Sequence, residues 1–387
     1  MADITHENID RIWNSLIHYL PERNKLDAAI DFVKSLEDIG VEEDEIINAM
    51  QLIWERMKII IEPSCAVPFA AVLRNKEEFR NKKIGIIGNQ TSMIDNAHLV
   101  DSLLSLGVDL VKVFSPEHGF RGKADAGAKI EDGIDVRTGI PIISLYGKNK
   151  KPSSKQLEKI DVLLFDIQDV GARFYTYIST LHYVMEAASK NNIRVIILDR
   201  PNPNGHYIDG PIREDGFESF VGMHPIPIVH GMTIGEYAKM INAENWISNK
   251  CNLIVIEMEN YTHDMHYDLP IKPSPNLPNS KSINLYPSLC LFEGTNISIG
   301  RGTDYPFQHF GAPYLESNYS FTPKSGEGSK YPKHKNIECF GTDLRFQDNY
   351  LTDINLNWII NSYNNCPYKE KFFTNFFDKL AGTEKLR

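Results

Sequence analysis

From residue 82 onward, the sequence alternates between short apolar runs rich in β-branched residues and longer stretches with helical periodicity. The apolar runs fall at residues 84–87, 110–114, 140–145, 162–165, 195–198 and 253–256, and the helical stretches at 97–106, 181–190 and 233–242. Strands that are apolar on both faces and separated by helices are typical of a parallel sheet covered on both sides. The alternation therefore predicts an α/β domain.

The segments on either side of this alternation differ from it in character. Residues 1–61 carry three apolar stripes at helical spacing, punctuated by Pro21 and Gly40, which predicts a helical extension without chemistry of its own. After about residue 270, Pro, Asn, Gly and aromatic residues dominate, which predicts a smaller α+β portion with a polar loop at 317–335. We therefore expect a helical extension at 1–61, a catalytic sheet domain at 62–270 and a smaller C-terminal domain at 271–387.

Composition and charge exclude several classes of partner. The 387 residues carry a formal net charge of -10, which argues against nucleic acid as a partner. No apolar run is long enough to span a bilayer, so we expect no membrane insertion, and the acidic start MADITHENID is unlike a secretory signal. The five cysteines are scattered along the sequence, as is typical of reduced thiols in a cytoplasmic protein.

Polar side chains follow four of the predicted strands, where open parallel sheets present their ligand-binding loops. They are Asn89 after the first run, Glu117 and His118 after the second, Asp166, Asp169 and Arg173 after a later one, and Asp199, Arg200 and Asn202 after the next. Four such loops predict a polar pocket along one edge of the sheet. The aromatic residues expected near it suit the faces of a sugar ring: Tyr146, Phe174, Tyr175, Tyr177, Trp246 and Phe307.

The sequence lacks the motifs of the common cofactor and nucleophile sites. No G-x-G-x-x-G follows the first strand, and neither a Walker loop nor a G-x-S-x-G is present. Glu117, His118, Asp166, Asp169 and His230 are residue types that bind metals, but no helical pair of histidines presets such a site. We expect no nucleotide cofactor, and a catalytic metal is the lesser alternative.

Long motifs in a fixed order connect this sequence to one family. They read SPEHGFRG, TGIPIISLYG, DVLLFDIQDVGARFYTYIST, LDRPNPNG, GPIREDGFESFVG, PIPIVHGMTIGEYAKMIN, PSPNLPN and LFEGTNISIGRGTDYPFQHFGAP. From about residue 67 to residue 387, the chain resembles the exo-β-N-acetylmuramidases, glycoside hydrolases of peptidoglycan turnover. The resemblance implies a Rossmann-like domain followed by a smaller domain, with the site in the cleft between them. It also implies release of β-1,4-linked N-acetylmuramic acid from the non-reducing end of cell-wall fragments, without a nucleotide or metal cofactor.

Within this activity, we expect Glu117 to be the general acid that protonates the departing glycosidic oxygen. The alternative is a structural Glu117 that caps the next helix. His118 either orients Glu117, or binds substrate, or is a neighbouring residue with satisfied hydrogen bonds. Glycosidases use a second carboxylate, for which Asp166 and Asp169 are the candidates and Glu293 the runner-up. The 2-acetamido group of the substrate could also act as the nucleophile.

The lactyl ether of muramic acid carries a carboxylate that an arginine can bind through two hydrogen bonds. Arg173 and Arg301 are the first choices and Arg200 is a third, although each could instead pair with an aspartate of the loops. Further contacts to hydroxyl and acetamido groups and to the sugar face are expected from Asn89, Tyr175, Asn202, His230 and Asn276, with Glu293 also bordering the substrate.

Three features depart from the family pattern. Ala128 stands in the sequence DAGA where relatives commonly read DAGE, and the chain ends at LAGTEKLR where relatives continue. Residues 1–61 resemble nothing in the family. These departures keep open a second class of function, a catalytically degenerate protein that binds muropeptides or sugars. Turnover of a chromogenic muramic acid glycoside would distinguish the enzyme from the binding protein.

Overall fold

The computed structural model describes residues 81–94, 97–117, 119–121, 132–326, 328–347 and 350–387. The predicted helical extension at 1–61, His118 and Ala128 lie outside the described residues. Within them, every helix is too short or too polar to span a bilayer.

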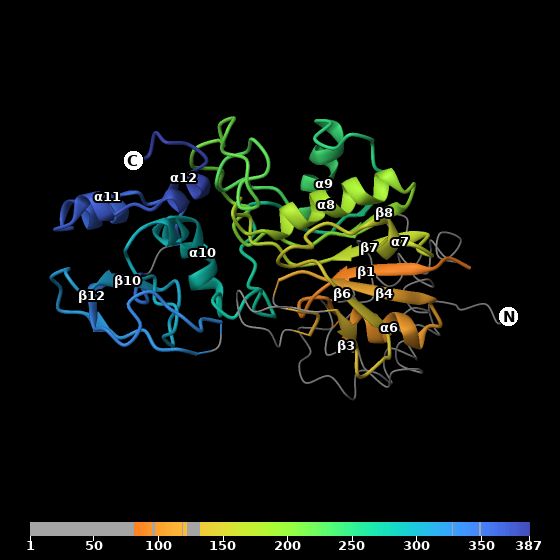
Figure 1. The fold of residues 1–387 in the computed structure, drawn as a ribbon, viewed down its shortest axis with the longest axis horizontal. Coiled ribbons are helices and arrows are strands. Elements are labelled where there is room, and N and C mark those ends of the chain that lie inside the picture. Colours follow the sequence, from red (N-terminus) through yellow and green to blue (C-terminus); the bar gives the residue numbers. More distant parts are fainter. Residues whose placement is uncertain (1–80, 95–96, 118, 122–131, 327, 348–349) are drawn as a thin grey trace, which may run out of the picture.

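A seven-stranded mixed sheet forms the centre of the first part of the chain (Figure 1). In spatial order its strands are β5 (Gly133–Ile134), β6 (Pro141–Ser144), β4 (Leu110–Ser115), β1 (Ile84–Gly88), β7 (Val162–Asp166), β8 (Arg194–Leu198) and β9 (Leu253–Ile256). The strands β6, β4, β1, β7, β8 and β9 pair with their neighbours in parallel. Strand β5 pairs with β6 in the antiparallel direction. Numbered along the chain, the six parallel strands have the order 3-2-1-4-5-6, which is the order of the Rossmann fold. The predicted α/β fold is confirmed.

The strands are apolar throughout because each face of the sheet packs on a separate layer. Successive side chains of a strand point to opposite faces. On β7, Val162 and Leu164 join one buried cluster, which also contains the apolar residues of α6 (Leu99–Ser105), whereas Leu163 and Phe165 join the other. That second cluster includes α8 (Tyr177–Lys190) and α9 (Ile234–Ala243). Figure 1 shows α8 and α9 on one side of the sheet and α6 on the other.

Two predicted helical stretches begin elsewhere than expected. The stretch at 97–106 opens as β3 (Ala97–His98), which pairs with β2 (Met93–Ile94), before α6 starts. The His98 side chain accepts a hydrogen bond from the Val100 backbone N–H and so caps the helix. Helix α8 starts at Tyr177, upstream of the predicted residue 181, and the four residues of this added turn are all buried. The short α7 (Ser154–Leu157) opens with a capping box.

The C-terminal part combines helices with a small antiparallel sheet. Its elements are α10 (Ser280–Leu289), η3 (Cys290–Gly294), β10 (His309–Ala312), β11 (Ser320–Phe321), β12 (Cys339–Asp343), α11 (Asn357–Asn364), η4 (Lys369–Lys371) and α12 (Asn375–Ala381). The sheet has the order β10-β12-β11. The smaller α+β portion is therefore present, and the segment 317–335 that was predicted as a loop contains β11.

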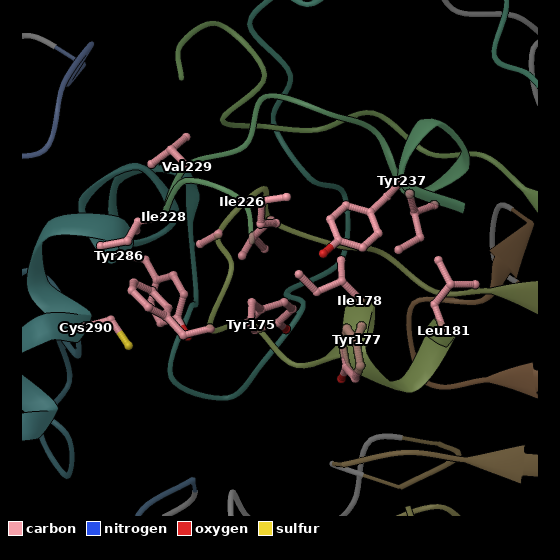
Figure 2. Packing of buried hydrophobic residues seen from close by; sticks show 14 of the residues in the cluster. Tyr175, Tyr177, Ile178, Leu181, Ile226, Ile228, Val229, Tyr237, Tyr286 and Cys290 are labelled. Carbon is pink, nitrogen blue, oxygen red and sulfur yellow. The ribbon is translucent and has the colours of Figure 1, made fainter. Parts of the chain in front are cut away.

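One buried cluster connects the two parts. It runs from the α8 face of the sheet through α10 and η3 to α12. Figure 2 shows Tyr175 between Tyr177 on one side and Tyr286 and Cys290, which come from the C-terminal part, on the other. The ring centroids of Tyr175 and Tyr286 are 5.8 Å apart. Because the core is continuous, the predicted domain boundary at residue 270 stays a prediction.

Candidate functional site

A cavity of about 1070 Å³ lies where the loops that follow the sheet strands meet the C-terminal part. Its walls come from both parts of the chain. The residues that bear on its chemistry are Glu117, Tyr146, Lys150, Phe174, Tyr175, Tyr177 and Phe220 from the first part, and Asn276, Tyr286, Glu293, Arg301, Phe307, Lys330 and Tyr331 from the second. The cavity thus combines carboxylates, cations and many aromatic faces.

Glu117 borders this cavity just beyond the end of β4. Its Oε1 accepts a hydrogen bond from the Tyr146 hydroxyl at 3.3 Å, and its backbone carbonyl accepts one from the Tyr177 hydroxyl at 3.4 Å. Tyr146 follows β6, the parallel neighbour of β4, so the sheet brings the two side chains together. Burial, together with the negative charge of Glu117, raises the pKa of Tyr146 to about 12. Tyr146 therefore remains a hydrogen-bond donor to Glu117 at neutral pH.

Asn89 lies behind this wall and supports it. Its Nδ2 donates to the Tyr177 hydroxyl at 2.9 Å, and its Oδ1 accepts hydrogen bonds from the backbone and hydroxyl of Thr91. Asn89 is fully buried and is not among the residues that line the cavity. The structure therefore connects Asn89 to the site through Tyr177.

Glu293 and Arg301 form an ion pair on the wall that the C-terminal part contributes. Arg301 Nε donates to Glu293 Oε1, and the guanidinium carbon lies 4.9 Å from the centroid of the Phe307 ring. Burial favours the neutral acid, but the charges of Arg301 and Lys333 outweigh it and lower the pKa of Glu293. Glu293 is therefore a carboxylate at neutral pH.

Lys333 stabilises the turn that carries Glu293. Its Nζ donates to the backbone carbonyls of Phe292, Thr295 and Ile297 at 3.0, 2.5 and 2.9 Å. Burial lowers the pKa of Lys333 to about 8, although the Glu293 carboxylate opposes this change. The lysine thus fixes the backbone around Glu293 and contributes positive charge near it.

Asp166 and Arg200 pair with each other away from the cavity. Arg200 Nε donates to Asp166 Oδ1 at 2.6 Å, and Asp166 is only 2% exposed. Neither residue lines the cavity. Of the carboxylates in the described part of the chain, those that border the cavity are Glu117 and Glu293. The runner-up from the sequence thus occupies the position expected of Asp166 or Asp169.

Asp169 is buried below the loop that leads to the cavity wall. Its Oδ2 accepts a hydrogen bond from the Gly171 backbone N–H at 2.7 Å and lies 3.7 Å from His230 Nε2. Burial raises the pKa of Asp169 to about 7 and lowers that of His230 to about 3, the latter with help from the Arg173 charge. The contact between Asp169 and His230 is therefore better described as one between two neutral side chains than as an ion pair.

Asn202 and His230 also serve the buried loops. Asn202 Nδ2 donates to the Met232 carbonyl at 2.9 Å, and His230 Nδ1 accepts from the Met232 N–H at 3.2 Å. Asn202 packs against Gly171, where a Cβ would lie 2.2 Å from Asn202 Oδ1 and the backbone φ is +73°. Neither Asn202 nor His230 reaches the cavity wall. They support the backbone that places Phe174 and the residues after it.

Arg173 connects the two parts of the chain from inside. The fully buried guanidinium donates to the carbonyls of Pro211 and Ile226 through Nη1, and to those of Leu380 and Ala381 through Nη2. These four bonds are 2.6 to 3.0 Å long. The structure therefore gives Arg173 a structural role and does not bring it to the cavity, where the sequence analysis had expected it to bind the substrate carboxylate.

Tyr175 and Asn276 do reach the cavity wall, as expected. The Tyr175 hydroxyl donates to the Pro273 carbonyl at 2.8 Å, and Asn276 Nδ2 donates to the Gly328 carbonyl at 2.8 Å. Most of the aromatic residues expected at the site line the cavity: Tyr146, Phe174, Tyr175, Tyr177 and Phe307. Trp246 does not, and it stacks on the buried His224.

Sequence reasoning missed Lys150, Phe220 and Lys330, which border the cavity. Lys150 follows the strand-like run at 140–145, and the lysine-rich sequence GKNKK was the signal that could have indicated it. In the part of the chain that the structure describes, no three His, Cys, Asp or Glu side chains gather as a metal site requires.

A cavity that combines two carboxylates with aromatic walls suits a sugar-cleaving hydrolase. Comparison with known proteins makes this specific. Residues 84–281 match the N-terminal model and residues 284–387 the C-terminal model of the exo-β-N-acetylmuramidase NamZ family. The chain belongs to this family and is a glycosidase.

Three relatives match this chain over most of their own length. The peptidoglycan β-N-acetylmuramidase NamZ of Bacillus subtilis is 41% identical over 348 residues, which are 81% of this chain and 80% of the relative. A crystal structure of a DUF1343 family protein from Bacteroides fragilis is 47% identical, with a TM-score of 0.76 over 82% of this chain and 88% of that one. A second one from the same organism is 31% identical, with a TM-score of 0.71 over 83% and 90%.

The N-terminal segment is similar to a different family. Residues 5–88 match a model of pyridoxal-phosphate dependent enzymes. The relatives include a serine racemase of Dictyostelium discoideum, 61% identical over 53 residues, and a β-hydroxyaspartate dehydratase of Paracoccus denitrificans, 44% identical over 63 residues. These matches cover 16% and 20% of the two relatives. The two family models overlap at residues 84–88, which form β1.

Proposed function

We propose that this chain releases N-acetylmuramic acid from the non-reducing end of peptidoglycan fragments, with Glu117 as the general acid. The observation that carries the proposal is the pair of carboxylates, Glu117 and Glu293, on walls contributed by different parts of the chain. Glycoside hydrolysis uses two such groups around the scissile bond. The relatives described above support the substrate.

The two carboxylates differ in their surroundings, and this difference supports different roles for them. Glu117 accepts a hydrogen bond from neutral Tyr146 and has no ion pair in the described part of the chain. Glu293 is ionised and paired with Arg301. Because Arg301 holds Glu293 as a carboxylate, we assign protonation of the leaving oxygen to Glu117. Glu293 supplies negative charge to the oxocarbenium-like transition state, as a nucleophile, as a base for water, or by orienting the 2-acetamido group of the substrate.

The remaining wall residues bind the sugar. Tyr175, Tyr177 and Phe174 offer aromatic faces to the apolar face of a pyranose ring. Asn276 reaches the cavity and is a candidate contact for the acetamido or hydroxyl groups. Arg301, whose charge Glu293 neutralises, is proposed to contact substrate oxygens while it holds Glu293 in place.

A pair of leaving groups tests the role of Glu117. We expect Glu117→Gln to lose about 10²- to 10⁴-fold in kcat on a muramyl disaccharide, because the amide donates no proton to the leaving oxygen. A dinitrophenyl muramoside needs little protonation, so its cleavage should fall far less. Glu293→Gln should lose activity on both substrates. The exposed Glu244→Gln is the matched control.

Two results would contradict the proposal in different ways. Equal losses of Glu117→Gln on both leaving groups would mean that Glu117 is not the acid. Binding of muramic acid by the wild-type protein without turnover of either substrate would favour the catalytically degenerate binding protein. A cytoplasmic site of action is part of the proposal, and the four free, buried cysteines in the described part of the chain are consistent with it.

A further inference from the structure

The cavity contains more positive charge than its ion pair uses. Its charged lining residues are Glu117, Lys150, Glu293, Arg301 and Lys330. Glu293 and Arg301 neutralise each other. Three cations face two carboxylates in this lining, so the cavity has a net positive charge. Such a cavity favours a substrate that carries a negative charge.

Lys150 is held in place without being neutralised. Its Nζ lies 3.9 Å from the centroid of the Phe220 ring. In the described part of the chain, no carboxylate forms an ion pair with it. A ring face attracts an ammonium group through its quadrupole but leaves the full charge available to a ligand. The side chain is half-buried, so its position is more restricted than that of an exposed lysine.

Helix α8 fixes the ring beneath Lys150. The Ser179 hydroxyl donates to the Phe220 carbonyl at 2.7 Å, and the Tyr183 ring stacks on Phe220 with centroids 6.1 Å apart. The adjacent Lys151 pairs with Glu186 of the same helix at 2.5 Å. Lys151 therefore anchors the loop to α8, and the preceding residue, Lys150, borders the cavity.

Lys150 also belongs to the wall that carries the proposed acid. Tyr146, which donates to Glu117, lies in the same loop after β6. Lys330 is the other uncompensated cation, but it is exposed and its Nζ is 5.7 Å from the nearest ring centroid, that of Tyr331. A freely rotating lysine loses conformational entropy when it binds a ligand. The contact with Phe220 already restricts Lys150, so Lys150 loses less entropy on binding than Lys330.

We propose that Lys150, positioned on Phe220, binds the carboxylate of the lactyl ether and so selects muramic acid over N-acetylglucosamine. The proposal rests on the proposed function for the identity of the sugar. It assigns to a lysine the role that the sequence analysis gave to Arg173 or Arg301. Arg173 is occupied by backbone carbonyls, and Arg301 is neutralised by Glu293.

Calorimetric titration of the two free sugars tests this assignment without requiring turnover. We expect Lys150→Met to weaken binding of N-acetylmuramic acid by about 10- to 100-fold, the range for one charge-assisted hydrogen bond. Binding of N-acetylglucosamine, which lacks the lactyl group, should stay within about twofold. Lys150→Arg should retain most of the affinity. The matched control is Lys148→Met, an exposed lysine of the same loop.

The methyl ester of N-acetylmuramic acid removes the same charge from the ligand side. Wild-type protein should lose about as much affinity for the ester as Lys150→Met loses for the acid, and Lys150→Met should distinguish little between acid and ester. Equal losses on both sugars, full discrimination of acid from ester by Lys150→Met, or a selective loss in Lys330→Met instead would overturn the assignment. Selective binding by a wild-type protein that cleaves no muramoside would leave Lys150 assigned and refute only the proposed function.

Discussion

The substitution Asp169→Asn should stabilise the protein more at pH 8 than at pH 5. Asp169 is completely buried, with one oxygen bonded to the Gly171 N–H and the other without a partner among the described residues. Burial raises its pKa from the ordinary 3.8 to about 7. Asparagine keeps the acceptor for Gly171 and removes the charge. The substitution therefore isolates the cost of ionising this carboxyl group inside the protein.

The sign and size of the effect follow from the two pKa values. Below pH 3.8 both the folded and unfolded states bind the proton, and the group has no effect on stability. As the pH rises toward 7, the unfolded chain ionises first, so the free energy of unfolding falls with pH and levels off above 7. At about 1.36 kcal/mol per pKa unit, the cost is about 1.5 kcal/mol at pH 5 and about 4 kcal/mol at pH 8.

Urea unfolding of both proteins at the two pH values measures the difference. The stability of Asp169→Asn relative to wild type should increase by about 2 to 3 kcal/mol between pH 5 and pH 8, because the other titrating groups are common to both proteins. The reasoning is refuted if the variant loses most stability at neutral pH. That result would show Asp169 ionised and paired with His230, whose Nε2 lies 3.7 Å away.

Three further substitutions test the framework around the cavity. Arg173→Met should lose at least about 3 kcal/mol of stability, measured by urea unfolding, because four buried carbonyls lose their donor; a selective loss of muramic acid affinity without destabilisation would restore its role as a substrate ligand. Gly294→Ala should lower the thermal midpoint, because its Cβ would lie 2.3 Å from Phe377 Cα; an unchanged midpoint would show that α12 shifts freely. Lys333→Met should lower both the midpoint and kcat through the turn that carries Glu293, and wild-type kcat would show that this turn needs no internal cation.

The sheet was predictable because its signal is local. Runs such as the one at 162–165 are apolar at every position, which is typical of a strand covered on both faces. The structure adds a residue to some runs, as in β7, where Asp166 continues the strand, and it shortens the run at 140–145 to β6. The small strand β11 escaped prediction because its two residues lie in a polar segment and depend on pairing with β12. Pairing between distant segments leaves little trace in a short polar sequence.

The candidate site was predictable only in part, because polar residues at strand ends can either bind substrate or support buried backbone groups. Glu117 and Asp166 both come after predicted apolar runs, and nothing in the sequence distinguishes them. In the structure, Asp166 pairs with Arg200, whereas Glu117 faces the cavity. Glu293 lies far along the chain, so only the docking of the C-terminal part reveals its position relative to Glu117. Lys150 was missed because lysine-rich loops are usually solvated.

Substrate binding and support of the backbone draw on the same types of residue, and this has a physical cause. The loops that leave the sheet are covered by the C-terminal part, and covered backbone groups need hydrogen-bond partners. Asp169, Asn202 and Arg173 supply them, and carboxylate, amide and guanidinium groups are also what a sugar-binding site needs. Arg173 bonds carbonyls on either side of the junction, so the same buried bonds that satisfy the loops hold the Glu293 wall against the Glu117 wall. Activity should therefore be lost when this docking is lost.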